Sequence, residues 1–208
     1  MSAGGLYATS QEIYPHLGAS SVLTPNVQWR FQSGAKVTFA HMFYEKEKYN
    51  WQGSQIPLLM FDELVHFTES QFFYMFSRNR STCGVRPYIR ATCNPDGESW
   101  VARFIDWWID PETGYADESR CGKLRYFIRR NNIIHWADTP QQLYEEFHLY
   151  SPEEMEEVKS VSFISAKLTD NAAMMKHDPG YIGALKAMSE FDQEQLLNGN
   201  WKIRRSAG

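Results

Sequence analysis

The run Pro57–Phe61 most constrains the fold, because five consecutive apolar residues are followed at once by Asp62 and Glu63. A short, continuous apolar run of this kind is typical of a strand buried on both faces of a parallel sheet. Helical patterns alternate along the chain with further strand candidates. We therefore expect an α/β domain built on a mainly parallel sheet with flanking helices.

The other elements follow from periodicity and turn signals. Strands are expected at 27–31, 36–40, 87–93 and 124–128, the first two joined as a β-hairpin insertion around Ser33-Gly34. Helices are expected at 6–16, 69–78, 98–109, 140–149, 152–159, 179–188 and 189–198, with a short apolar segment at 161–166. The pattern predicts a core over 1–139 and a helical C-terminal lid or linker over 140–208.

Composition limits the function classes. A hydrophobic share of 43% in 208 residues is enough to bury the core of one domain. The net charge of −4 argues against a chain coated in basic residues for tight DNA binding, although it leaves room for a local basic strip. Three cysteines without a C-x-x-C pair make a disulfide framework or zinc site unexpected. No apolar run approaches the roughly 20 residues of a membrane span, and the first residues lack the features of a signal peptide.

The segment 58–63 (LLMFDE) has the form of a Walker B element. Ligands of α/β sheets gather at the carboxyl ends of the strands. There Asp62 can hold Mg²⁺ against nucleotide phosphates, and Glu63 can orient and deprotonate an attacking water. The alternative is that both carboxylates merely cap the following helix, where negative charge is favoured.

A second strand ends in a polar tip about thirty residues later. Thr92 and Asn94 each offer a hydrogen-bond donor without adding charge, as a contact to the γ-phosphate or its water requires. The alternative is that the segment 94–97 (NPDG) is simply a turn, since Asn, Pro and Gly are favoured there for backbone reasons.

Read together and in order, these segments resemble the ATPase domain of the tailed-phage terminase large subunit. The matching segments are 4–6 with Ser10, 51–55 (WQGSQ), 61–69 (FDELVHFTE), 77–80 (SRNR), 91–95 (ATCNP), 163–171 (FISAKLTDN) and 196–201 (LLNGNW). The resemblance covers nearly the whole chain and implies a P-loop-NTPase-like fold of the ASCE type. It implies a viral DNA-packaging motor that couples ATP hydrolysis to translocation of DNA into the procapsid.

The resemblance also implies roles for particular residues. Asp62 would hold Mg²⁺, Glu63 would activate water, and Asn94 with Thr92 would sense the γ-phosphate and couple hydrolysis to motion. Arg78 and Arg80 are candidates for an arginine finger or a DNA-phosphate contact. ATP and Mg²⁺ are the implied cofactors. The implied partners are double-stranded DNA, the portal protein, the small terminase subunit and further copies in a homo-oligomeric ring, in the cytoplasm of the bacterial host and without a membrane.

The sequence departs from the family in one important respect, because it contains no G-x-x-x-x-G-K-[ST] phosphate-binding loop. We therefore expect an incomplete motor domain, lacking the Walker A loop and the C-terminal nuclease domain, that has no ATPase activity on its own. Two alternatives stay open. One is a catalytically dead prophage remnant or interaction module that keeps the fold without turnover. The other is an unrelated α/β hydrolase or nuclease that uses Asp62 and Glu63 with a metal.

Overall fold

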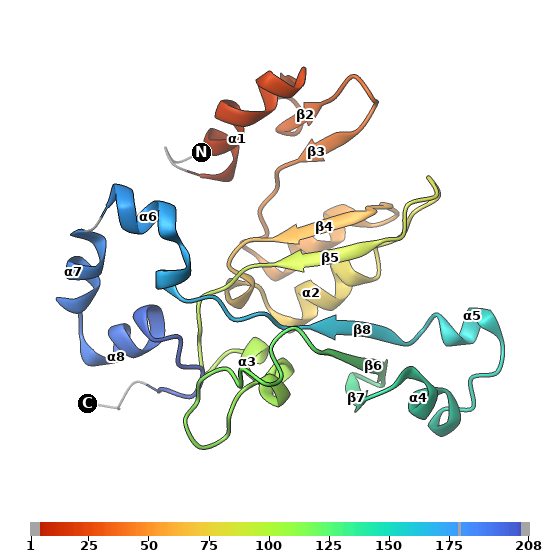
Figure 1. The fold of residues 1–208 in the computed structure, drawn as a ribbon. Coiled ribbons are helices and arrows are strands. Elements are labelled where there is room, and N and C mark those ends of the chain that lie inside the picture. Colours follow the sequence, from red (N-terminus) through yellow and green to blue (C-terminus); the bar gives the residue numbers. More distant parts are fainter. Residues whose placement is uncertain (1–4, 179, 205–208) are drawn as a thin grey trace. The chain divides into compact units, whose positions relative to one another are not determined.

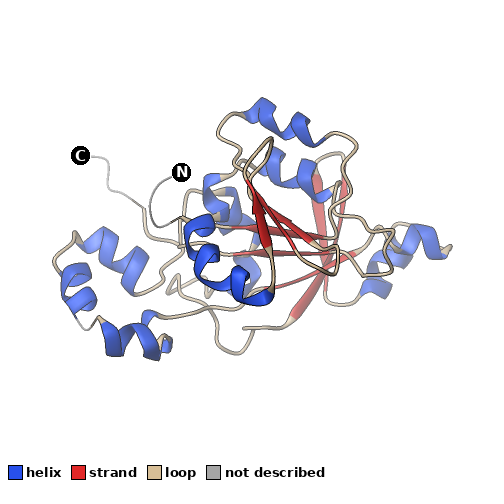
Figure 2. Ribbon diagram, turned by 90° about the horizontal axis from the view of Figure 1, so that it is seen from above, coloured by secondary structure: helices blue, strands red, loops and turns tan. Residues whose placement is uncertain are grey.

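The computed structural model of the chain describes residues 5–178 and 180–204, which form two compact units (Figure 1). Unit 1 comprises Met1–Gln55 and Ser70–Arg78, and unit 2 comprises Ile56–Glu69 and Asn79–Gly208. The strands form three small sheets, drawn in red in Figure 2. The fold is thus a mixed α/β arrangement, as expected.

Unit 1 is built around a hairpin and a helix. Its elements are α1 (Leu6–Ile13), β1 (Ser20–Val22), β2 (Gln28–Arg30), β3 (Lys36–Thr38), a 3₁₀ helix (Glu45–Trp51) and most of α2 (Glu69–Phe76). The three strands form one antiparallel sheet in which β2 and β3 make the predicted hairpin. Gly34 turns the chain there with φ of 85°, a value that favours glycine. Trp29 is buried, and its indole N–H donates to the Ser10 hydroxyl at 2.8 Å.

Unit 2 contains a parallel pair and an antiparallel sheet. The pair is β4 (Leu58–Phe61) beside β5 (Tyr88–Ala91), and the sheet is β7 (Ile133–Ala137), β6 (Leu124–Arg130) and β8 (Lys159–Ser162), in that order. The expectation of a mainly parallel sheet is therefore wrong for the described residues. Asn131 and Asn132 both adopt positive φ, 50° and 64°, and so form a two-residue turn that makes β6 and β7 antiparallel.

The predicted helices of unit 2 are shorter than periodicity indicated, and a helix at Ala172–His177 falls where none was expected. The helices of unit 2 are α3 (Trp100–Phe104), α4 (Pro140–Glu146), α5 (Pro152–Met155), α6 (Ala172–His177), α7 (Gly180–Lys186), α8 (Glu190–Asp192) and a π-helical turn (Gln193–Leu197). Position 179 of one expected helix lies outside the described residues. None of the helices in the described part of the chain is long and apolar enough to cross a membrane. The predicted boundary between 1–139 and 140–208 stays a prediction.

Candidate functional site

The site lies where the two parallel strands end. β4 and β5 run side by side, with Phe61 opposite Ala91, so the residues that follow them meet at one edge of the sheet (Figure 1). The pairing continues past both strands, because Thr92 N–H donates to the Phe61 carbonyl at 2.9 Å and Leu64 N–H to the Thr92 carbonyl at 2.8 Å. Phe61 and Leu64 are buried and anchor the chain on each side of the two carboxylates.

Asp62 and Thr92 form the first polar pair at this edge. The Thr92 hydroxyl donates to Asp62 Oδ1 at 2.8 Å and accepts the Glu63 N–H at 3.4 Å. Both residues are exposed, so the remaining lone pairs of the Asp62 carboxylate face solvent. This hydrogen bond therefore holds the Asp62 carboxylate and the Thr92 hydroxyl in fixed positions at the carboxyl ends of β4 and β5.

Glu63 and Asn94 form the second pair. The Asn94 side-chain amide donates to Glu63 Oε1 at 2.8 Å, and the Asn94 backbone N–H donates to Oε2 at 3.2 Å. Glu63 also has φ of 54° and ψ of 60°, the left-handed region that non-glycine residues seldom occupy. Such a conformation costs on the order of 1–3 kcal/mol and persists where surrounding contacts impose it. Asn94 thus fixes the direction of both carboxylate oxygens of Glu63.

The structure therefore brings together four residues that the sequence singled out separately, although their roles stay predictions. The expected turn lies slightly later than 94–97, because Ser99 N–H donates to the Asp96 carbonyl at 3.1 Å. Ser99 then caps α3 by accepting the Ala102 N–H at 3.2 Å. Sequence reasoning missed Gln195, whose side-chain amide donates to the Pro95 carbonyl beside Asn94. No local motif marks that glutamine, which is 100 residues away along the chain.

The arginine candidates come from other segments of the chain. Arg78 follows α2 in unit 1, where its guanidinium carbon stands 4.9 Å from the centre of the Tyr74 ring. Arg80 belongs to unit 2 and is exposed in the segment between α2 and β5. A role for either as an arginine finger or a DNA-phosphate contact stays a prediction.

The exposed oxygen atoms of this site suit Mg²⁺ better than a metal that is held by protein ligands alone. The described residues contain no group of three or more His, Cys, Asp or Glu side chains arranged to hold a metal ion. Mg²⁺ is usually bound through one or two carboxylates together with phosphates and water. Asp62, exposed and hydrogen-bonded to Thr92, fits that pattern.

Cys93, which lies in the site, differs in acidity from Cys83, which precedes β5. Burial raises the pKa of the Cys93 thiol to about 11, and the negative charge of Glu63 adds to the effect. A hydrogen bond from the Ser81 hydroxyl, followed by one from the Val85 backbone, lowers the pKa of the exposed Cys83 thiol. Cys93 is thus held as a protonated thiol between Thr92 and Asn94.

We expect iodoacetamide at pH 8 to alkylate Cys83 well before Cys93 in the folded chain. The thiolate is the nucleophile, and a thiol of pKa about 11 is ionised to only about one part in a thousand at that pH. Timed alkylation followed by peptide mass spectrometry measures both rates. Ser81→Ala should slow Cys83 alone, and urea should bring the rates together. Equal rates in the folded chain would contradict the described surroundings of Cys93.

Fold and site together define a mixed α/β protein with two carboxylates and two polar partners at the ends of adjoining parallel strands. The family model described as "Terminase large subunit, T4likevirus-type, N-terminal" matches residues 8–208. The chain therefore belongs to this family of terminase large subunits, which confirms the resemblance and supports a role in phage DNA packaging. No curated protein and no solved structure gives a match to the chain.

Proposed function

We propose that the chain is the hydrolytic part of a packaging motor that couples ATP hydrolysis to the translocation of DNA into the procapsid. The carrying observation is the double pairing of Asp62 with Thr92 and Glu63 with Asn94 at the shared end of β4 and β5. Ligands of α/β sheets bind at the carboxyl ends of the strands. Membership of the terminase large-subunit family makes ATP the nucleotide that we propose.

Each residue has a distinct role in this proposal. Asp62 would hold Mg²⁺, which when bound neutralises charge on the phosphate oxygens. Glu63 accepts a proton from the attacking water. A carboxylate offers about four lone-pair sites, so the two hydrogen bonds from Asn94 leave room for that water. Asn94 holds the Glu63 carboxylate in place at the carboxyl ends of β4 and β5 and contacts the γ-phosphate.

The alternative proposal is a catalytically dead prophage remnant or interaction module. The absence of a Walker A loop from the 208 residues favours it, because the phosphates then lack the backbone N–H groups and the lysine that usually bind them. The two proposals differ in one measurable respect. A working motor part gains nucleotide binding and turnover when the loop is supplied, and a remnant does not.

The hydroxyl of Thr92 tests the proposed metal site. In the chain supplied with a Walker A segment, we expect Thr92→Val to weaken Mg²⁺ binding in the presence of ATP by about 10–100-fold, the usual effect of losing a partner of a metal ligand. Valine keeps the shape of threonine but cannot donate to Asp62. Thr92→Ser retains the hydroxyl and is expected to bind Mg²⁺ nearly as the unaltered chain does. Calorimetric titration with Mg²⁺ measures the difference, and an unchanged affinity in Thr92→Val would count against the proposed role of Asp62.

A further inference from the structure

A cavity of about 500 Å³ in unit 2 is lined by three cationic side chains that the proposed hydrolytic site does not use. Arg103 comes from α3, and Lys202 and Arg204 come from the segment after the π-helical turn. Asp106 is the one carboxylate among the described residues that line the cavity. The lining thus carries a formal charge of +2 on a chain whose net charge is −4.

The backbone that presents Lys202 is fixed by its neighbours. Asn200 Oδ1 accepts the Lys202 N–H at 2.9 Å and the Ile203 N–H at 3.1 Å. Trp201 is buried, and its N–H donates to the Gly114 carbonyl at 2.8 Å. Gly97 packs so closely that an added Cβ would stand 2.8 Å from the Trp201 carbonyl oxygen. This wall of the cavity is therefore preformed.

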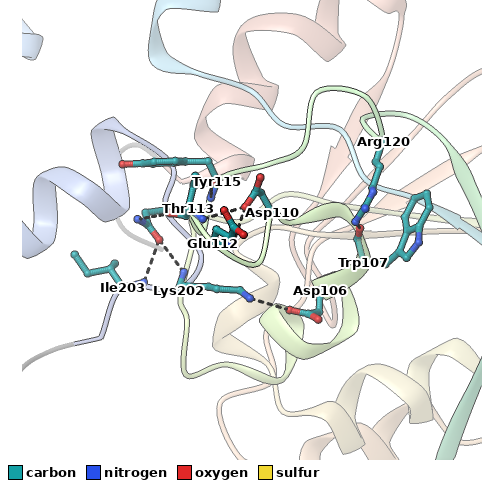
Figure 3. A network of polar contacts seen from close by, with 10 residues as sticks. Asp106, Trp107, Asp110, Glu112, Thr113, Tyr115, Arg120, Lys202 and Ile203 are labelled. Carbon is teal, nitrogen blue, oxygen red and sulfur yellow. Dashed lines mark hydrogen bonds and ion pairs between the residues drawn. The ribbon is translucent and has the colours of Figure 1, made fainter.

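Lys202 and Arg103 each form a loose ion pair with a carboxylate among the described residues. Lys202 Nζ lies 3.7 Å from Asp106 Oδ1 (Figure 3), and Arg103 Nη2 lies 3.9 Å from Glu69 Oε2. Both distances exceed those of ordinary hydrogen bonds. The side chains of Lys202 and Arg103 are 40% and 70% exposed, so each pair contributes little and each cation can turn toward an incoming anion.

We propose that this cavity binds backbone phosphates of double-stranded DNA. Arginine guanidinium groups match phosphate oxygens in a two-pronged geometry, and lysine adds a point charge. Of the lining residues that the structure describes, only Trp201 is aromatic, and at 5% exposure it offers no face on which a base can stack. Contacts to backbone phosphates carry no sequence information, so recognition by these cations is by charge, as a protein that slides along DNA requires. The inference rests on the DNA-translocating part of the proposed function and is independent of Asp62 and Glu63.

Binding of a fluorescent DNA duplex of unrelated sequences to the 208-residue chain, followed by anisotropy over a range of salt concentrations, tests the proposal. Arg103→Ala and Lys202→Ala are each expected to weaken binding about three- to tenfold at low salt. Each should also lower the slope of log affinity against log salt by about 0.9, the value for one lost phosphate contact. Asp106→Asn should act in the opposite direction and tighten binding about two- to fivefold, because it removes the one anion of the lining.

Lys186→Ala is the matched control, since Lys186 is exposed on α7 and does not line the cavity. Its affinity and salt slope are expected to match those of the unaltered chain. Circular dichroism shows whether each variant is folded, and Asp106→Asn keeps the test decisive should Lys202→Ala unfold. Unchanged slopes in both alanine variants, or an equal loss in Lys186→Ala, would overturn the proposal.

Inorganic phosphate provides the second arm. If the cavity takes phosphate groups within DNA, millimolar phosphate competes only weakly with the duplex, because several contacts act together along the backbone. Binding of free phosphate to the unaltered chain but not to Lys202→Ala, without any binding of duplex, would refute DNA as the ligand. A chain that binds DNA at Arg103 and Lys202 but never hydrolyses ATP would keep this inference and defeat the hydrolytic proposal.

Discussion

Glu63→Gln is expected to lower ATP turnover by about 10²–10⁴-fold in the chain supplied with a Walker A segment, the range attributed to a general base. Glutamine retains the length of the side chain and one oxygen that can accept from Asn94. It cannot take a proton from water at neutral pH. The affinity for ATP should change little, because in the proposed mechanism Glu63 contacts the water and not the phosphates. Phosphate release under saturating ATP and equilibrium binding of labelled ATP separate the two quantities.

Glu98→Gln is the matched control for this experiment. Glu98 is exposed in the loop after Asn94, where its backbone N–H donates to Asp96 Oδ1 at 3.0 Å, and it undergoes the same chemical change. Turnover in this variant should equal that of the unaltered assembly. Comparable losses in the two variants would indicate a general effect of charge, and full activity in Glu63→Gln would remove Glu63 from the proposed mechanism.

The second large effect concerns the 208-residue chain alone, which we expect to bind ATP weakly, to melt below about 65 °C and to self-associate. The pair of β4 and β5 is a two-stranded parallel sheet in the described part of the chain. Parallel sheets are ordinarily covered on both faces, yet Leu58 and Met60 on one face of β4 are 36% and 61% exposed. Open strand edges and exposed apolar side chains favour association with another chain.

Supplying a separate segment with a strand, a Walker A loop and a helix is expected to raise the melting temperature and to bring ATP affinity toward the micromolar range. Scanning calorimetry, light scattering and ATP titration follow the three properties. The same segment with its loop lysine changed to alanine should still raise the melting temperature without restoring ATP binding. A chain that is monomeric, melts above about 65 °C and gains nothing from the segment would contradict the incomplete-domain interpretation and favour a remnant or interaction module.

Sequence patterns predicted the strands whose signal is local. The apolar run before Asp62 and the polar tip at Asn94 located β4 and β5 closely. Both the burial of a strand and its end depend on residues that are neighbours in the sequence. The antiparallel sheet of β6, β7 and β8 was harder to predict from the sequence. The turn at Asn131-Asn132 lacks glycine, so the strand after it went unrecognised. β8 (Lys159–Ser162) begins where a helix was expected to end, and its pairing with β6 depends on residues far away in the chain.

The candidate site was predictable as a set of residues but not as a set of contacts. Hydrogen bonds from Thr92 to Asp62 and from Asn94 to Glu63 span 30 and 31 residues. The parallel pairing that creates them follows from the fold and from no single motif. The cationic cavity was missed for the same reason, since Arg103 and Lys202 are far apart in the chain and line one cavity, where the Trp201 backbone packs closely against Gly97.

The left-handed backbone of Glu63 has an evolutionary consequence. Glycine or asparagine would adopt this conformation at lower cost, and relief of the strain would add on the order of 1 kcal/mol to the stability of the fold. Under drift alone, substitutions that stabilise a domain and harm no activity accumulate easily. A glutamate that stands where a smaller residue fits the backbone better is therefore the kind of compromise that selection for a carboxylate maintains.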